Sequence, residues 1–207
     1  MRDNSVWGAE FSEDRKYRFA LWRTWGHTDK GKVMFIGLNP STANEQLNDP
    51  TIKRCINFAK SWGYGGMFML NLYAYVSTDP KKLVLDENIL KNNENLLEYS
   101  KKSDIVVFAW GCFKSHKKRM KEVESMFPDA YCINKSKDRF PCHPLFQKGD
   151  TGLSFNKIGS RNKIRVFKRF DSSGCCCDQC SLTLNTCCET PFPLVTNVVH
   201  FGFLQAK

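Results

Sequence analysis

The feature that most constrains the fold of this chain is a regular alternation of short apolar runs with segments of helical periodicity. The apolar runs are rich in residues that favour strands, and they lie at 33–38, 67–73, 105–110 and 130–133. A strand followed by a helix, repeated in this way, implies a parallel sheet covered by helices on both faces. We therefore predict an α/β fold, a three-layer α/β/α domain with a four-stranded parallel sheet.

The gaps between these runs contain the expected helices. The first helix starts beside Asp49, a good capping residue, and Pro50, which suits a first helical turn, and it ends before Gly63. The second is expected at 86–99 and the third at 113–126. Each helix would cross from the end of one strand to the start of the next.

The two ends of the chain differ from this repeating region. Tyr17, Leu21 and Trp25 recur at intervals of four residues, which predicts an N-terminal helix packed on the core. Beyond about residue 147 the periodicity decays, although 163–170 alternates and could form an edge strand. We expect one domain over residues 1–170 and a poorly ordered Cys-rich tail over residues 171–207.

Composition and charge limit the classes of protein to consider. A hydrophobic fraction of 42% is typical of a globular protein and argues against a mostly disordered chain. The excess of 31 Lys and Arg over 21 Asp and Glu gives a net charge of +10, which suits an anionic partner. Because no apolar run reaches the length of a membrane span and no export signal begins the sequence, we expect a cytoplasmic monomer without a membrane partner, or a nuclear one in a eukaryote.

The ten cysteines form two groups. Cys55, Cys112, Cys132 and Cys142 are scattered and are expected to be reduced, whereas six others crowd into 175–188. The crowded group could supply thiolates to zinc or an iron–sulfur cluster, but adjacent Cys-Cys pairs fit the usual paired knuckles poorly. We therefore favour an appendage without metal, expect no cofactor, and keep metal binding by the tail as an alternative.

Candidate site residues follow the predicted strands, because ligands of parallel sheets bind beyond the carboxyl ends of the strands. The candidates for substrate binding are polar or conformationally special residues at these ends: Gly37, Pro40, Ser41, Thr42, Asn71, Tyr73 and Gly111. Asn39 and His143 lie at the same edge and are the candidates for catalysis.

Several short motifs carry a resemblance to known families. The segments 33–40, 69–72, 106–111 and 143–145, with Asn39, Asn71 and His143 among them, are similar in order and spacing to motifs of the uracil-DNA glycosylase superfamily. Tyr17-Arg18, the Gly-Leu-Asn-Pro-Ser-Thr-Ala run at 37–43, Asp49-Pro50, the Trp-Gly-Tyr-Gly-Gly run at 62–66 and Thr78-Asp79-Pro80 resemble an uncharacterised bacterial and phage domain family. The resemblance covers roughly residues 15 to 147.

The resemblance to the glycosylase superfamily implies roles for three residues. Asn39 would orient the attacking water by hydrogen bonds, since an amide cannot act as a base. Asn71 would read a pyrimidine edge with the donor and acceptor of its amide, and a neutral His143 would donate to the base as negative charge develops on it. His143-Pro144-Leu145 lacks the Ser-Pro that the superfamily has before its wedging Leu, and no clear catalytic carboxylate is visible.

A separate indication of function is a stripe of lysines on the third expected helix. Lys114, Lys117, Lys118 and Lys121 recur at i, i+3, i+4 and i+7, which places four cations on one helix face. Such a stripe suits a nucleic-acid backbone, although a solvated helix face has the same pattern.

Each candidate residue has a structural alternative. Asn39 and Pro40 could form only a turn, Asn71 could be a core amide with all its hydrogen bonds made, and His143 could lie in a rigid surface loop. The leading hypothesis is a nucleobase-processing enzyme, an N-glycosylase-type hydrolase, that acts on DNA or a nucleotide. The alternative is a non-catalytic module that binds a nucleotide or nucleic acid.

Overall fold

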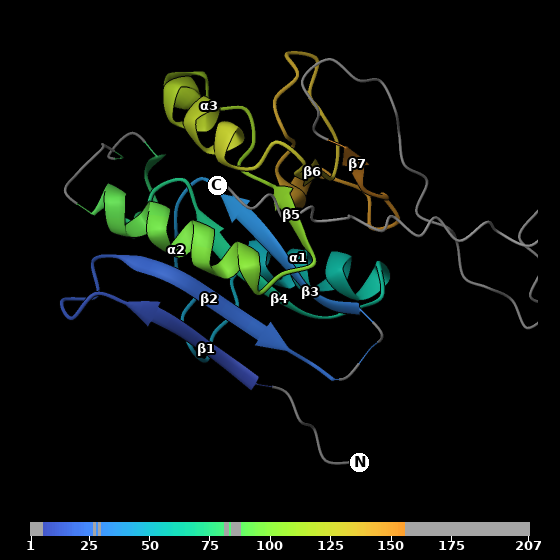
Figure 1. The fold of residues 1–207 in the computed structure, drawn as a ribbon, viewed down its shortest axis with the longest axis horizontal. Helices are drawn as coiled ribbons and strands as arrows, with labels where there is room; N and C mark the ends of the chain where they lie inside the picture. Colours follow the sequence, from blue (N-terminus) through green and yellow to red (C-terminus); the bar gives the residue numbers. More distant parts are fainter. Residues whose placement is uncertain (1–5, 27, 29, 81–82, 84–87, 156–207) are drawn as a thin grey trace, which may run out of the picture. The chain divides into compact units, whose positions relative to one another are not determined.

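The sheet has seven strands in the order β1-β2-β4-β3-β5-β6-β7. The computed structural model describes residues 6–26, 28, 30–80, 83 and 88–155 (Figure 1). The strands are β1 (Val6–Phe11), β2 (Arg18–Thr24), β3 (Lys30–Gly37), β4 (Tyr64–Asn71), β5 (Ile105–Phe108), β6 (Tyr131–Cys132) and β7 (Ser154–Phe155).

The predicted four-stranded parallel sheet is therefore wrong in its number of strands. The four apolar runs form β3, β4, β5 and β6, which are neighbours and run parallel to one another. Antiparallel strands extend this group on both sides, with β2 and β1 beyond β4 and β7 beyond β6. The added strands are joined by local connections or are short, so they lack the strand–helix repeat on which the prediction rested.

The N-terminal helix predicted from Tyr17, Leu21 and Trp25 is also wrong, because this segment contains β2. Phe19 and Leu21 are both almost fully buried, since β2 lies between β1 and β4 within the sheet. Apolar residues four positions apart share one face of a strand as well as one face of a helix. The spacing alone therefore did not separate the two structures.

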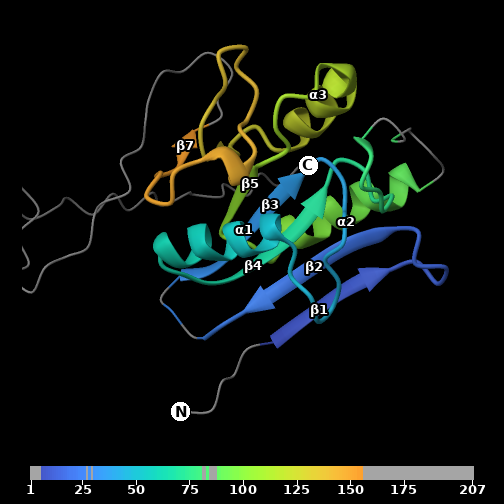
Figure 2. The same ribbon diagram turned by 180° about the vertical axis from the view of Figure 1, so that it is seen from behind.

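Three α-helices cover the two faces of the sheet, and they are α1 (Pro50–Ser61), α2 (Ile89–Lys101) and α3 (Lys117–Met126). Met34 and Ile36 of β3 belong to a core that includes Leu96 of α2 and Val123 of α3. The residues that alternate with them in β3 belong to a second core, which α1 covers. Figure 1 looks onto the side of α2, and Figure 2 looks onto the side of α1.

The start and end of α1 agree with the sequence prediction. Asp49 Oδ1 accepts the backbone N–H of Ile52 at 2.8 Å, Pro50 stands in the first turn, and Gly63 follows the helix with a φ of +84°. The helix expected at 113–126 is divided, since a 3-10 turn, η2 (Lys114–His116), precedes α3. The third core-facing helix is therefore shorter than predicted.

The remaining predictions on chain organisation lie outside the described residues. These are the edge strand at 163–170, the domain boundary at residue 170 and the Cys-rich tail at 171–207 with its metal alternative. Among the helices of the described ranges, none combines the length and apolar character that crossing a membrane requires.

Candidate functional site

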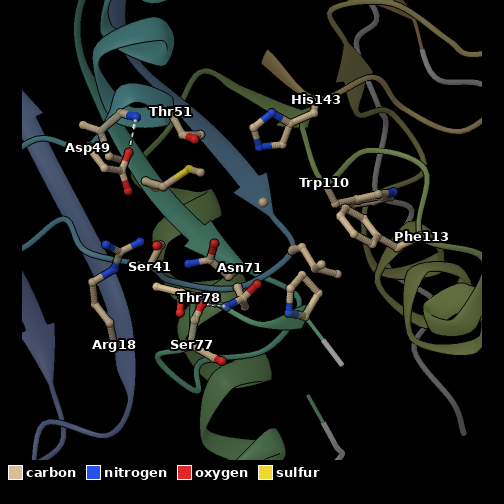
Figure 3. Close-up of a pocket in the computed structure, with 16 residues that line it drawn as sticks. Arg18, Ser41, Asp49, Thr51, Asn71, Ser77, Thr78, Trp110, Phe113 and His143 are labelled. Atoms are coloured by element: carbon tan, nitrogen blue, oxygen red, sulfur yellow. Dashed lines mark hydrogen bonds between the residues drawn. The ribbon is translucent and has the colours of Figure 1, made fainter. Parts of the chain in front are cut away.

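A pocket of about 180 Å³ lies beyond the carboxyl ends of β3 and β4, beside the start of α1 (Figure 3). Its lining comes from the start of β2, the ends of β3 and β4, the β3–α1 loop, the first turn of α1, and the loops after β4, β5 and β6. The lining residues are Arg18, Gly37, Leu38, Asn39, Ser41, Asp49, Thr51, Ile52, Met69, Asn71, Ser77, Thr78, Pro80, Trp110, Phe113 and His143. Pockets for drug-sized ligands usually measure about 300–1,000 Å³, so this one is small.

The pocket brings together five of the candidate residues, which come from three separate segments: Gly37, Asn39, Ser41, Asn71 and His143. The other candidates lie elsewhere. Tyr73 bonds through its hydroxyl to His116 Nδ1 at 3.0 Å, and Thr42 is exposed. Pro40 and Gly111 contribute by holding neighbouring residues, as described below.

Asn71 is a buried amide without a hydrogen-bond partner. Its side chain is 1% exposed, and neither Oδ1 nor Nδ2 has a partner among the residues that the structure describes. Buried polar groups in proteins are nearly always paired, and leaving one unpaired costs about 1–3 kcal/mol. The alternative of a core amide with all its bonds made is therefore wrong for the described residues, and both amide atoms keep unused hydrogen-bonding capacity beside the pocket.

Asn39 is held in one orientation by the loop around it. Its Nδ2 donates to Pro40 O at 2.9 Å and to Ser77 O at 2.6 Å, while Ser77 N donates to Pro40 O at 3.0 Å. Both amide hydrogens are thus used within the protein. What Asn39 can offer a ligand or water is its Oδ1 as an acceptor.

His143 turns its ring into the pocket (Figure 3). Its Nδ1 accepts from the backbone N–H of Leu145 at 3.4 Å, and burial lowers its pKa below the usual 6.5. A neutral ring that accepts at Nδ1 carries its hydrogen on Nε2, which makes Nε2 a donor. His143 therefore belongs to the lining of the pocket.

Gly111 positions the segment that carries His143. It has a φ of +85°, its N–H donates to Pro141 O at 3.1 Å, and a Cβ at this position would lie 3.3 Å from the Cβ of His143. A side chain here would strain the backbone and press on His143. Gly111 thus influences the pocket indirectly, because it leaves room for the position that His143 takes.

Two charged residues of the pocket were not predicted as site residues. Arg18 was quoted only within a family motif, and Asp49 was assigned only to capping α1. Burial lowers the pKa of Arg18 to about 10, and the charge of Asp49 opposes this effect. The Tyr17-Arg18 motif was the signal that could have indicated Arg18, but the segment around it was predicted to be a helix, so its burial in a strand was not expected.

Apolar side chains form the rest of the wall. Trp110 and Phe113 line one side of the pocket (Figure 3), and Met69 is another residue of the lining. Trp110 also packs against Phe108 in the core, with ring centroids 4.4 Å apart. The pocket therefore combines flat apolar surfaces with a few polar groups, which is the usual composition of a small-molecule site.

The lysine stripe lies outside the pocket. Lys117, Lys118 and Lys121 are exposed on α3, whereas Lys114 lies in η2 and pairs with Asp138 at 2.9 Å. Three lysines on α3 are thus not engaged in an ion pair within the described part of the chain. Their arrangement fits both a nucleic-acid surface and a solvated face.

Residues 18–145 match a family described as "Protein of unknown function (DUF1643)". The chain belongs to the DUF1643 family. The DUF1643 region begins at Arg18 and includes every residue that lines the pocket, whereas β1 and β7 lie outside it. No curated protein and no solved structure gives a significant match.

Proposed function

We propose that the pocket binds a pyrimidine-type nucleobase and that this DUF1643 protein is a nucleobase-processing enzyme of the uracil-DNA glycosylase superfamily type. The observation that carries the proposal is Asn71, a buried amide that leaves a donor and an acceptor unused. The edge of uracil or thymine presents a ring N–H next to a carbonyl, which complements one primary amide. Phe113, a partly exposed aromatic residue of the pocket lining, also offers a flat surface that suits one base.

The proposed reaction is hydrolysis of the bond between the base and its sugar. Water adds to the sugar carbon, and the bonding electron pair leaves with the base. Asn39 Oδ1 accepts a hydrogen bond from this water and orients it, and Asp49 supplies a carboxylate that can take its proton. His143 Nε2 donates to the base as negative charge develops there.

The test incubates the full chain with oligonucleotides that carry uracil, mismatched thymine or other modified bases and measures abasic product. We expect product from at least one base, with strong loss in Asn39→Ala and Asp49→Asn. No product from any base would overturn the enzymatic part of the proposal. Activity that survives unchanged in Asn39→Ala would overturn the assigned role of that residue.

A second candidate function is a module that binds a nucleotide or nucleic acid without chemistry. The observation that favours it concerns Asn39. Its two amide hydrogens bond to Pro40 O and Ser77 O, as expected of a residue that stabilises the loop rather than takes part in a reaction. Saturable binding of the same ligands without any product would support this candidate. The exposed lysines of α3 then predict binding that weakens with salt.

A further inference from the structure

Arg18 differs from the other buried arginines of the described chain. Three arginines are buried there, namely Arg18, Arg23 and Arg119. Arg23 donates to the carbonyl oxygens of four residues and to Asn48 Oδ1. Arg119 donates to Leu72 O and Asn93 Oδ1, and its Nη1 lies 2.7 Å from Glu122. Arg119 Nη1 has no hydrogen-bond partner within the described residues, but the Glu122 carboxylate compensates its charge, and Arg23 is hydrogen-bonded at all three nitrogens.

The guanidinium of Arg18 lacks such compensation. Arg18 is 2% exposed and its Nη1 donates to Ala43 O at 2.8 Å, but its Nε has no partner among the described residues. Asp49 does not approach to the 4 Å of an ion pair, and its Oδ1 already accepts from Ile52. A buried charge that is neither paired nor fully hydrogen-bonded is costly, which makes an external partner favourable.

The surroundings of Arg18 supply further donors to such a partner. Its guanidinium points into the pocket toward Ser41 and Asp49 (Figure 3). Ser41, Thr51 and Thr78, which carry hydroxyl groups, line the same pocket, and Thr51 belongs to the first turn of α1. Guanidinium and hydroxyl groups near a helix start are the usual ligands of a phosphate.

We propose that Arg18 and the neighbouring hydroxyls bind the terminal phosphate group of the ligand whose base occupies the same pocket. This inference rests on the proposed function for the identity of the base. Arg18 is buried, so a phosphate that reaches it should stand at the end of its molecule. A phosphodiester within a continuous strand has chain on both sides, and both parts of that chain would have to pass through the pocket. The Asp49 carboxylate opposes the anion, so its charge would weaken phosphate binding.

The first experiment measures binding by calorimetry with three probes, namely deoxyuridine 5′-monophosphate, deoxyuridine and inorganic phosphate. We expect the monophosphate to bind about tenfold to hundredfold more tightly than the nucleoside, as for charge-assisted hydrogen bonds. Arg18→Gln should remove this difference between monophosphate and nucleoside and should remove the binding of inorganic phosphate. Arg23→Gln is the matched control, because it changes a buried arginine outside the pocket lining.

A second variant guards against loss of binding through misfolding. Asp49→Asn keeps a residue that can cap α1 and removes the opposing charge. We expect it to raise affinity for inorganic phosphate severalfold, a gain that an unfolded protein cannot produce. Unchanged or weaker phosphate binding in Asp49→Asn would contradict the proposed position of the anion.

The source of the phosphate is settled by a pair of short oligonucleotides that differ only in a 5′-terminal phosphate. Preference for the phosphorylated strand over the free monophosphate would assign the site to a DNA end, and the reverse preference would assign it to a nucleotide. Equal affinity of Arg18→Gln and the wild type for all phosphate probes would overturn the inference. Arg18-dependent binding of inorganic phosphate without any nucleoside binding would instead overturn the proposed base and leave the anion site standing.

Discussion

The side chain of Asn71 occupies the space that a Cβ would need at Gly37. The two residues are partners in the parallel register of β3 and β4, and a Cβ built on Gly37 would lie 2.9 Å from Asn71 Oδ1. The same Cβ would lie 2.9 Å from Met69 Cε, another lining atom. Because Gly37 has no side chain, the side-chain amide of Asn71 can lie over Gly37 and face the pocket.

Gly37→Ala tests this relationship. We expect the alanine to displace the amide of Asn71, lower ligand affinity at least tenfold and cost about 1–3 kcal/mol of stability, as other overpacked sites do. Calorimetry and urea unfolding measure the two effects. Gly149→Ala is the control, because a Cβ there meets its nearest atom, Arg54 Nη1, at 3.6 Å. Full affinity in Gly37→Ala would show that the orientation of Asn71 does not matter for binding.

Asn71→Leu should separate stability from function. Leucine has a similar shape and removes two unpaired polar atoms, so we expect the free energy of unfolding to stay equal or rise by about 1–3 kcal/mol while base binding is lost. Asn92→Leu is the contrasting variant. Asn92 Nδ2 donates to Asn71 O and Leu72 O at 3.1 Å each, so its replacement should destabilise the protein by a similar amount. A clear loss of stability in Asn71→Leu would indicate that Asn71 has internal partners.

His143 predicts a pH dependence of stability. Burial lowers its pKa in the folded protein below 6.5, so the unfolded chain binds its proton more readily. The stability contributed by the neutral ring is complete above pH 6.5 and is lost as the pH falls through the lower pKa of the folded state. Urea unfolding between pH 5 and pH 8 should show a slope in wild type that is smaller in His143→Gln. Identical slopes in the two proteins would exclude the shift.

The lysines of α3 predict a salt dependence of DNA binding. If Lys117, Lys118 and Lys121 each contact a phosphate, log K should fall against log salt with a slope of about −2.7. Lys117→Glu with Lys118→Glu should weaken binding and flatten this slope. Lys53→Glu with Lys60→Glu, on α1, makes the same change of charge on the opposite face of the sheet. Equal weakening by both pairs would indicate a nonspecific effect of net charge.

Sequence reasoning located the central strands and the start of α1 because these depend on local patterns. Continuous apolar runs identify buried strands, and Asp49 with Pro50 identifies a helix start through capping chemistry. The β2 strand was missed because residues at intervals of four share a face in both helix and strand. Asn39, Asn71 and His143 were chosen as candidates because strand ends in a parallel sheet are where ligands bind, and the structure places all three in the lining of one pocket.

The sequence by itself determined the strand–helix alternation, the edge of the sheet where a site would lie and four of the polar residues in the pocket. The tertiary structure decided which polar groups have partners. It left Asn71 unpaired, used the amide hydrogens of Asn39 within the loop, and buried Arg18 beside Asp49. These outcomes depend on contacts between residues far apart in the chain, and no local pattern encodes whether a buried polar atom finds a partner.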